Sequence, residues 1–578
     1  MIKLFKLLKP YKISIVLILI FVFLQMLAQL YLPTLMASIV DIGIVNQDIE
    51  YIIKTGGLML LVSVLGGLFT ILANYLSART GTGFSKTVRR LIFSKVEGFS
   101  LHEIDQLGTA SLITRTTNDI NQIERFVIMM LRMMVTAPMM AIGGIIMALS
   151  KDTKLSLVLI FSLPLLGIGV FIVSKKVIPL FKLMQKKLDK VSRVMREYLT
   201  GIRVIRAFSR ENHEKKRFDH ASRDLADNAI LINKIMAVMM PLAMLVMNLS
   251  VVAIVWFGSF RIEAGQMMVG DLMAYIQYVM QILFSFLMVS MVFIMLPRAS
   301  ASAERINEVL ETEENILDPV EPEDIEKARE KRGYLEFRNV SFSYFGAEEP
   351  ALKNISFKAK PGEMTAIIGS TGSGKSTLVN LIPRFYDINN GSILINGIDI
   401  RNIPQKKLRA RIGLVPQKAV LFSGTIAENI RVGNKDASDE EIKKAAKIAQ
   451  AAEFISSFEN GFDSYIEQGG VNLSGGQKQR LSIARALVKR PEIFIFDDSF
   501  SALDFKTDAR LRTALKKEIS GSTFIIVAQR VSSIMHADRI IVLNEGKIAS
   551  IGKHQKLLED CQVYQQIVYS QLSEEELA

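Results

Sequence analysis

Cysteine is nearly absent from this chain, which has one, Cys561, among 578 residues. A lone cysteine excludes an internal disulfide framework and suits a protein whose soluble part stays in a reducing cytosol. A signal-peptide cleavage site is lacking as well. The apolar run Ile13–Leu24 follows four lysines, but no small-residue cleavage site is evident and further apolar runs come after it. We therefore expect an uncleaved first membrane span.

Acidic residues are outnumbered, with 57 Asp and Glu against 70 Lys and Arg and a net charge of +13. Such an excess can indicate nucleic-acid binding. Most of it lies beside apolar runs, however, at 3–12, 79–95 and 175–234. Basic residues that flank apolar segments mark the cytoplasmic side of a membrane protein. The charge therefore indicates membrane topology, and we expect no nucleic-acid partner.

Long apolar runs are abundant. Half of the residues are hydrophobic, and the mean hydropathy of +0.29 is too high for an ordinary soluble enzyme. The runs lie before about Pro297, which indicates a membrane half followed by a soluble half. The six segments of spanning length are Ile13–Leu32, Thr55–Ser77, Val127–Leu149, Leu155–Ser174, Ile235–Phe257 and Leu272–Leu296.

The connections between these segments alternate in length and charge. The short ones carry few basic residues, whereas the N-terminus and the long connections 79–125 and 175–234 are rich in them. Both chain ends and both long connections should therefore be cytoplasmic. Each long connection is predicted as a helix that leaves the bilayer, a turn and a returning helix. Their tips, 99–119 and 198–211, would touch the soluble domain.

Methionine is abundant in the membrane half, for example at Met129, Met139, Met239 and Met244. Such residues could line an adaptable cavity for varied apolar ligands. We favour the simpler interpretation that they pack against other helices or face lipid, and we assign no cargo contacts.

The domain organisation follows from these patterns. Residues 1–311 are predicted to form an all-α transmembrane domain with six helices and two long cytoplasmic coupling loops. Residues 312–333 are charged, contain two prolines and lack an apolar period, so they are predicted as a linker. Strand-like and helix-like stretches then alternate, which predicts an α/β domain over 334–578 with a central, largely parallel sheet; the glycine-rich string described next makes it a predicted nucleotide-binding domain.

The string GSTGSGKST follows the apolar run Thr365–Ile368. It fits G-x-x-x-x-G-K-[ST], a loop whose backbone N–H groups close around a nucleotide's phosphates with a helix N-terminus behind them. Lys375 would pair with the β- and γ-phosphates, and Ser376 would ligate Mg²⁺. The residues predicted to bind the nucleotide here are Gly369, Ser370, Thr371, Gly372, Ser373, Gly374, Lys375, Ser376 and Thr377.

Two further strings give this loop its context. The apolar run Ile493–Phe496 ends in Asp497, a carboxylate that can hold the nucleotide's Mg²⁺ through water. Between the two lies Leu473-Ser474-Gly475-Gly476-Gln477, which opens a helix. A serine hydroxyl, two glycines and a helix N-terminus suit phosphate binding. The residues predicted to contact nucleotide from this string are Ser474, Gly475, Gly476 and Gln477.

Together these strings resemble the ATP-binding cassette (ABC) transporter family, whose hallmark is LSGGQ, and the resemblance covers nearly the whole chain. It implies that ATP is the nucleotide and that Tyr344 stacks on adenine. It also implies that Gln417, in VPQ, contacts Mg²⁺ and the attacking water. The string Ser501-Ala502-Leu503-Asp504 would form the loop that crosses to a partner domain.

The same resemblance implies exporter-type coupling segments and a dimer of half-transporters. In such a dimer ATP lies between the P-loop of one nucleotide-binding domain and the LSGGQ of the other. The positions of this chain that match the two coupling segments are Gly108, Leu112, Arg115 and Asp119, and then Glu197, Gly201, Ala207, Phe208 and Glu211.

Two residues depart from the family pattern. Asp498 stands where the family has the glutamate that polarises water, and its carboxylate is drawn back by about 1 Å or more, a misplacement that can cost about a hundredfold in rate. Gln529 stands where the family has its switch histidine, and it cannot become charged near neutral pH. With Gln417, these are the expected catalytic positions. Ser376, Gln417 and Asp497 are the expected Mg²⁺ ligands. We expect tight ATP binding and slow hydrolysis at this site.

These expectations combine into an exporter half-transporter of the cell (inner) membrane that moves apolar or amphipathic compounds, such as drugs or lipids. It would pair with a different half-transporter that carries the missing Glu and His. A homodimeric exporter and an ATP-gated channel or regulatory membrane protein are the alternatives. A soluble ABC ATPase of the DNA-repair type is disfavoured by the six spans.

Overall fold

The computed structural model describes residues 1–327, 332–518 and 521–571, and the chain divides into two compact units. We call Met1–Glu97 with Ala110–Thr312 the helical unit, and Gly98–Thr109 with Glu313–Ala578 the sheet unit. Residues 328–331 of the predicted linker, and residues 519–520 and 572–578 of the predicted nucleotide-binding domain, lie outside the described residues.

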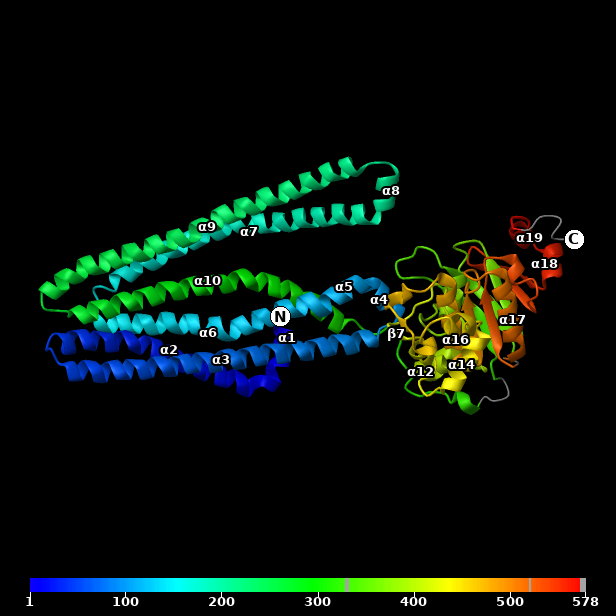
Figure 1. The fold of residues 1–578 in the computed structure, drawn as a ribbon, viewed down its shortest axis with the longest axis horizontal. Coiled ribbons are helices and arrows are strands. Elements are labelled where there is room, and N and C mark those ends of the chain that lie inside the picture. The colour runs from blue at the N-terminus through cyan, green and yellow to red at the C-terminus, as the bar shows by residue number, and fades with distance from the viewer. Residues whose placement is uncertain (328–331, 519–520, 572–578) are drawn as a thin grey trace. The chain divides into compact units, whose positions relative to one another are not determined.

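The helical unit consists of long helices (Figure 1). Six described helices are long and apolar enough to cross a membrane, which confirms the six predicted spans. α3 has 49 residues and is about 74 Å long, whereas the hydrocarbon core of a bilayer is about 30 Å thick. The helices therefore continue well beyond a membrane. The α-helices of the helical unit, short ones included, are α1 Ile2–Phe5, α2 Lys12–Ser38, α3 Ile49–Glu97, α5 Thr109–Thr114, α6 Ile120–Lys151, α7 Leu157–Thr200, α8 Ile202–Ala207, α9 Glu211–Glu263 and α10 Val269–Glu311.

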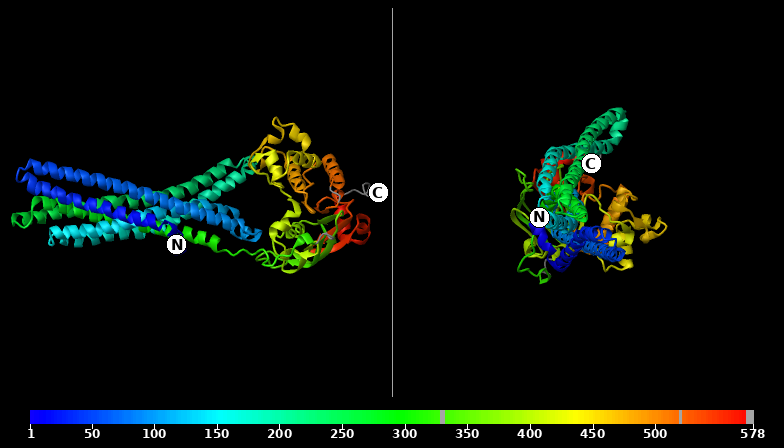
Figure 2. Two further views of the ribbon diagram at one scale, coloured as in Figure 1. Left: turned by 90° about the horizontal axis from the view of Figure 1, so that it is seen from below. Right: turned by 90° about the vertical axis from the view of Figure 1, so that its left-hand side faces the viewer.

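The long helices associate in pairs: α2 with α3, α6 with α10, and α7 with α9. The α7 and α9 pair runs side by side in Figures 1 and 2, closed at one end by α8. Polar side chains inside the bundle find partners on neighbouring helices. The hydroxyls of Ser162 and Ser250 lie 2.6 Å apart, and Tyr278 Oη donates to the Leu30 carbonyl at 3.0 Å. Such bonds join helices where no water is present to replace them.

The methionines of the helical unit occupy packing and surface positions. Met139, Met239 and Met247 pack against buried core residues, whereas Met134 and Met244 are exposed. Met139 also lines an apolar cavity with Met26 and Met147, so both interpretations drawn from the sequence stay predictions.

A partly buried ionic network joins the segment before α6 to the end of α10. Asp119 is 3% exposed and accepts hydrogen bonds from Ser302 Oγ at 2.9 Å and Arg305 Nε at 2.8 Å. Arg115 donates to the Arg305 carbonyl at 3.1 Å and pairs with Glu308 at 2.8 Å. Two of the weak matches noted in the sequence, Arg115 and Asp119, therefore have a structural role as partners in one network.

Replacing Asp119 with alanine should destabilise the helical unit by about 2 kcal/mol, because the change removes a buried carboxylate that accepts hydrogen bonds from Ser302 and from the half-exposed Arg305. A lower melting temperature of the purified chain in detergent would show this. The control is Asp227→Ala, at an exposed position on α9, which should leave the melting temperature near that of the unchanged protein. Equal melting temperatures for the two variants would contradict the assigned role of Asp119.

The sheet unit contains a six-stranded sheet in the order β12-β11-β3-β10-β9-β6 and a four-stranded antiparallel sheet in the order β2-β1-β4-β5. In the larger sheet only the β11 and β12 pairing is antiparallel, which confirms the predicted, largely parallel sheet. The strands are β1 Leu335–Phe342, β2 Leu352–Ala359, β3 Met364–Gly369, β4 Asn390–Ile395, β5 Ile398–Asp399, β6 Ile412–Val415, β7 Gly424–Thr425, β8 Tyr465–Ile466, β9 Ile493–Asp497, β10 Thr523–Val527, β11 Arg539–Asn544 and β12 Lys547–Gly552.

Both faces of the parallel part of the large sheet are covered, which explains why its parallel strands are mainly apolar. In β9, Ile493 and Ile495 face a core shared with the antiparallel sheet, while Phe494 and Phe496 face a second core built with helices. The helices of this unit are α4 Leu101–Leu107, α11 Lys375–Leu381, α12 Gln405–Ala410, α13 Ile426–Arg431, α14 Asp439–Ile448, α15 Ala452–Ser456, α16 Gly475–Val488, α17 Phe505–Glu518, α18 His554–Asp560 and α19 Gln562–Tyr569.

The first part of the tip 99–119, up to Thr109, belongs to the sheet unit, and the rest belongs to the helical unit. α4 begins with a capping box in which Ser100 and Glu103 each bond to the other's backbone, and Leu101 packs against the core shared by the two sheets. This tip therefore touches the soluble unit, as the sequence predicted. The second tip, with α8, belongs to the helical unit, and its contact with a soluble domain stays a prediction.

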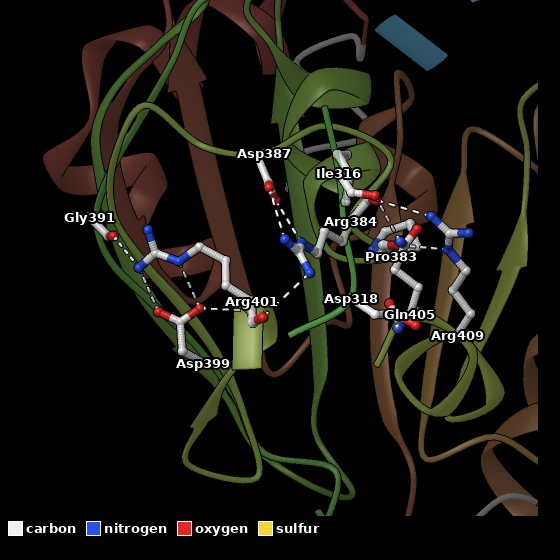
Figure 3. Close-up of polar contacts among 10 residues, drawn as sticks. All are labelled: Ile316, Asp318, Pro383, Arg384, Asp387, Gly391, Asp399, Arg401, Gln405 and Arg409. Carbon is white, nitrogen blue, oxygen red and sulfur yellow. Dashed lines mark hydrogen bonds and ion pairs between the residues drawn. The ribbon is translucent and has the colours of Figure 1, made fainter. Parts of the chain in front are cut away.

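The segment 313–327, which we call the connecting segment, is attached to α12. The backbone N–H of Gln405 donates to Asp318 Oδ1 at 2.8 Å, and its side-chain amide donates to the Ile316 carbonyl at 3.2 Å (Figure 3). Further along, Ile325 is 2% exposed within the core. These contacts hold the described part of the predicted linker on the sheet unit.

Candidate nucleotide-binding site

The predicted P-loop lies between β3 and α11, and its glycines are required by close backbone packing. A Cβ on Gly369 would lie 2.2 Å from the Leu543 carbonyl oxygen. Gly374 has φ +98°, and a Cβ there would lie 2.7 Å from Leu352 Cδ2 and 3.0 Å from the Ala351 carbonyl oxygen. Only glycine fits these positions without a shift of the loop.

Lys375 and Ser376 begin α11 directly behind the loop. Lys375 Nζ donates to the carbonyls of Gly369 and Ser370 at 2.8 and 2.7 Å, so the ammonium closes the loop into a ring. Burial lowers the pKa of this ammonium, although the nearby Asp498 and Asp497 carboxylates oppose the shift. A buried cation beside a loop of backbone N–H groups is suited to phosphate oxygens.

The hydroxyl of Ser373 gives a further indication of a ligand. Its Oγ is buried and has no hydrogen-bond partner among the described residues, whereas buried polar atoms usually have one. On the outer side of the loop, Ser370, Thr371 and Gly372 are exposed. The loop therefore combines an unpaired buried hydroxyl, a buried ammonium and glycine positions, a set that fits a nucleotide's phosphates.

Two adjacent carboxylates, Asp497 and Asp498, follow β9. Ser376 Oγ donates to Asp497 Oδ1 at 3.3 Å. This hydrogen bond directly joins two of the three predicted Mg²⁺ ligands. Burial raises the pKa of both carboxyls; the bond from Ser376 opposes the shift at Asp497, and the bond from Gln417 opposes it at Asp498. Among the described residues no cluster of three His, Cys, Asp or Glu side chains could hold a metal ion. A hydroxyl with one carboxylate suits Mg²⁺ that keeps waters and phosphate oxygens as its other ligands.

The two predicted partners of the attacking water lie beside Asp498. Gln417, two residues after β6, donates from Nε2 to Asp498 Oδ2 at 3.4 Å, a long hydrogen bond. The main-chain N–H of Gln529 lies near the same carboxyl and opposes the rise in its pKa, and Gln529 as a whole is exposed. The structure thus brings Gln417, Asp498 and Gln529 together.

Tyr344 lies two residues beyond β1 and borders the P-loop helix. Its hydroxyl shares a hydrogen bond of 3.0 Å with Thr377 Oγ1, and the residue is 39% exposed. A partly exposed ring next to the phosphate-binding loop is placed where a nucleotide base can stack.

The LSGGQ string caps α16 in the single chain. Ser474 Oγ accepts from the Gln477 N–H at 3.3 Å, and Gln477 Oε1 accepts from the Ser474 N–H at 2.8 Å. Ser474 and Gly475 are exposed, and a Cβ on Gly475 would meet nothing within 4 Å. No hydrogen bond between described residues joins this string to the P-loop, since α16 packs in one core and α11 in the other. Within one chain the two halves of the predicted ATP site are therefore not joined.

The sequence did not indicate two further contributors to this region. Ser499 is fully buried and donates from Oγ to the Val415 carbonyl at 3.0 Å, which fixes the loop after Asp498 to the strand that carries Gln417. Tyr386 lies beside Tyr344, with ring centroids 5.4 Å apart. A serine and a tyrosine between strands have no distinctive spacing, so only the fold identifies them.

Known protein families match both parts of the chain. The family described as "ABC transporter transmembrane region" matches residues 15–286, and the family described as "ABC transporter" matches residues 352–501. The second match covers the P-loop, the LSGGQ string and both carboxylates.

Similar proteins extend over nearly the full length. An uncharacterized ABC transporter ATP-binding protein of Mycobacterium tuberculosis is 43% identical over 566 residues, 97% of each chain. An ATP-dependent lipid A-core flippase of Chromobacterium violaceum is 32% identical over 541 residues, 93% of this chain and 92% of the flippase. The structure of a bacterial Atm1-family ABC exporter with ATP bound matches with a TM-score of 0.81 and 27% identity, covering 97% of this chain and 99% of that one.

Proposed function

Because the chain belongs to the ABC transporter family, we propose that it is the degenerate-site half of a heterodimeric exporter. The chain is a multi-pass membrane protein with a cytoplasmic nucleotide-binding domain, and it couples ATP hydrolysis to export of the lipid or multidrug type. Exporters of this family act as dimers. In the proposed dimer the chain's own P-loop site binds ATP and hydrolyses it slowly, while its LSGGQ completes the active site of the partner.

The observation that carries this proposal is the short carboxylate of Asp498 between Gln417 and Gln529. The bond from Gln417 is already 3.4 Å long, so neither side chain is drawn tightly toward a common water position. Gln529 adds a neutral amide where a cationic ring could otherwise stabilise developing negative charge on the γ-phosphate. Weak water activation and weak charge stabilisation together support slow hydrolysis at this site.

The groups that bind ATP are all present. Lys375 would pair with the β- and γ-phosphates, and Tyr344 would stack on adenine. Ser376 and Asp497 would hold Mg²⁺, together with Gln417. Bound there, Mg²⁺ would supply positive charge to offset the charge of the β- and γ-phosphates. The chain's own residues would hold the phosphates in the loop and keep the γ-phosphate oriented for attack by water.

The cargo is proposed to be apolar or amphipathic. The buried residues of the helical unit are mainly apolar, and one relative of similar length is a lipid A-core flippase. ATP binding would close the paired nucleotide-binding domains, and the coupling tips would transmit this closure to the helices and switch the cavity from inward-facing to outward-facing. Hydrolysis would then reset the transporter.

Steady-state ATPase activity of the purified chain in lipid, alone and mixed with candidate half-transporters, tests the proposal. We expect negligible turnover alone and restored turnover with one partner.

In that mixture, Gly475→Asp in this chain should abolish most turnover, because it places a charged side chain where the partner's ATP would bind. Lys375→Ala should reduce turnover to a smaller degree, because it affects the slow site. Brisk turnover of the chain alone would instead indicate a homodimeric exporter, and a single-channel current in ATP would indicate a channel.

A further inference from the structure

Three aromatic rings beside the P-loop form a compact cluster around Tyr344. The ring of Tyr344 packs edge-to-face on Phe342, with centroids 4.9 Å apart at 82°, and on Tyr386, with centroids 5.4 Å apart at 86°. Its hydroxyl is held by Thr377. The orientation of Tyr344 therefore depends on Thr377 at one end of the ring and on Tyr386 along its side.

Tyr386 is in turn held by α4. Its Oη donates to Asp105 Oδ2 at 2.8 Å, and Tyr386 is only 9% exposed. Burial and the nearby Asp105 carboxylate raise the pKa of the Tyr386 hydroxyl, so it remains a donor. A second contact comes from His102 of α4, whose ring packs on Phe345, the residue after Tyr344, with centroids 5.3 Å apart. α4 thus contacts Tyr386, whose ring packs on Tyr344, and Phe345, which follows Tyr344 in the sequence.

The residues on both sides of Tyr386 are held by polar contacts, which Figure 3 shows. Arg384 has φ +54° and grips both oxygens of Asp387 at 2.7 and 2.9 Å. Arg409 donates to the carbonyls of Pro383 and Arg384, at 3.1 Å each. A bidentate ion pair and two charge-assisted bonds fix the turn on each side of Tyr386.

α4 is fixed on its other side by the connecting segment. Glu103 Oε1 accepts from the Asn315 N–H at 3.1 Å, and the following residues, Ile316 and Asp318, are bound to Gln405 (Figure 3). The hydrogen bond from Tyr386 to Asp105 therefore joins α4, which is held by the connecting segment, to the turn around Tyr386, which is held by Arg384 and Arg409. A change in one part reaches the other through this bond and the ring packing.

We infer that Asp105 and Tyr386 are positioning residues for the nucleotide base, which link adenine stacking on Tyr344 to the seating of α4. This inference rests on the proposed function, since it requires Tyr344 to stack on adenine. A base stacked on Tyr344 limits the motion of the Tyr344 ring, which in turn limits the motion of the Tyr386 ring. The hydrogen bond from Tyr386 to Asp105 then limits the motion of α4. Because such coupling is reciprocal, a firmly seated α4 also raises the affinity for the base.

Equilibrium binding of ATP and of inorganic tripolyphosphate to the full chain in lipid nanodiscs tests this link. Tyr386→Phe and Asp105→Ala should each weaken ATP binding about fivefold and leave tripolyphosphate binding unchanged, because tripolyphosphate has no base. Asp105→Asn keeps an acceptor oxygen for Tyr386 and should restore most of the affinity. Tyr465→Phe, at a tyrosine that is 63% exposed, is the matched control and should bind both ligands normally.

A spin label on α4 gives an independent measurement. Gln106 is exposed on α4, and Cys561 is the only cysteine, so Gln106→Cys in a Cys561→Ala background carries one label. ATP should reduce the mobility of this label, whereas tripolyphosphate should not. In Tyr386→Phe the two ligands should have the same effect. A label that responds equally to both ligands in the otherwise unchanged chain would overturn the inference.

Tyr344→Ala separates failure of this inference from failure of the proposed function. Loss of base stacking should weaken ATP binding about tenfold or more and spare tripolyphosphate. If that holds while Tyr386→Phe and Asp105→Ala bind ATP normally, the link to α4 is wrong and the ATP site stands. If Tyr344→Ala changes neither ligand, the adenine platform is wrong and the link falls with it. Equal loss of both ligands in Tyr386→Phe would place the effect on the P-loop and also overturn the inference.

Discussion

Asp498→Glu is expected to raise ATP turnover at the chain's own P-loop site by about a hundredfold. The added methylene extends the carboxylate by about 1 Å or more toward the water position, and the 3.4 Å bond from Gln417 shows that this side is not tightly packed. One cost opposes the gain. Asp498 has φ +46°, a conformation that aspartate tolerates better than most residues. The net effect should still be a large increase, because in the proposed function the short carboxylate of Asp498 is the main cause of slow hydrolysis.

The rate must be measured where only this site can turn over. In the mixture with a partner, the P-loop lysine of the partner is replaced, so that remaining ATPase activity comes from the P-loop of this chain. Asp439→Glu is the matched control, since it adds the same methylene to an exposed carboxylate in the first turn of α14, outside the predicted ATP site. Gln529→His combined with Asp498→Glu should raise turnover further. Equal and brisk rates for the unchanged chain and Asp498→Glu would mean that the site is not impaired.

Gly374→Ala is expected to weaken ATP binding by about a hundredfold. An alanine at φ +98° is strained, and its Cβ would meet Leu352 Cδ2 at 2.7 Å and the Ala351 carbonyl oxygen at 3.0 Å. The loop must shift to relieve these contacts, and a shift of about 1 Å misplaces Lys375 and the N–H groups that hold the phosphates. Equilibrium binding of ATP to the purified chain measures the loss.

Gly362→Ala isolates the effect of the clash from that of the backbone conformation. Gly362 precedes β3, has φ +77° and would place its Cβ in open space. Its substitution should lower stability by about 1 kcal/mol and leave ATP binding unchanged. If Gly374→Ala binds ATP as tightly as Gly362→Ala does, the close packing of the loop does not determine nucleotide affinity.

Local patterns were sufficient to predict several parts of this protein. The six spans follow from apolar runs of bilayer length, because the cost of exposing polar groups to lipid leaves few other solutions. The P-loop and the parallel sheet follow from glycine spacing and from apolar strands such as Ile493–Asp497, which are typical of a sheet covered on both faces. These features depend on the order and type of neighbouring residues, which a sequence displays directly.

The placement of residues distant in sequence was decided only by the tertiary structure. Asp105 and Tyr386 are 281 positions apart, and Asp119 and Arg305 are 186 apart; no local spacing predicts either pair. The sequence by itself determined the membrane and nucleotide-binding halves, the phosphate loop and the departures at Asp498 and Gln529. The tertiary structure alone decided that the connecting segment is attached to α12 and that the ring of Tyr386 packs on Tyr344. The physical reason is that these contacts arise from packing between elements, whose partners are selected by the whole fold.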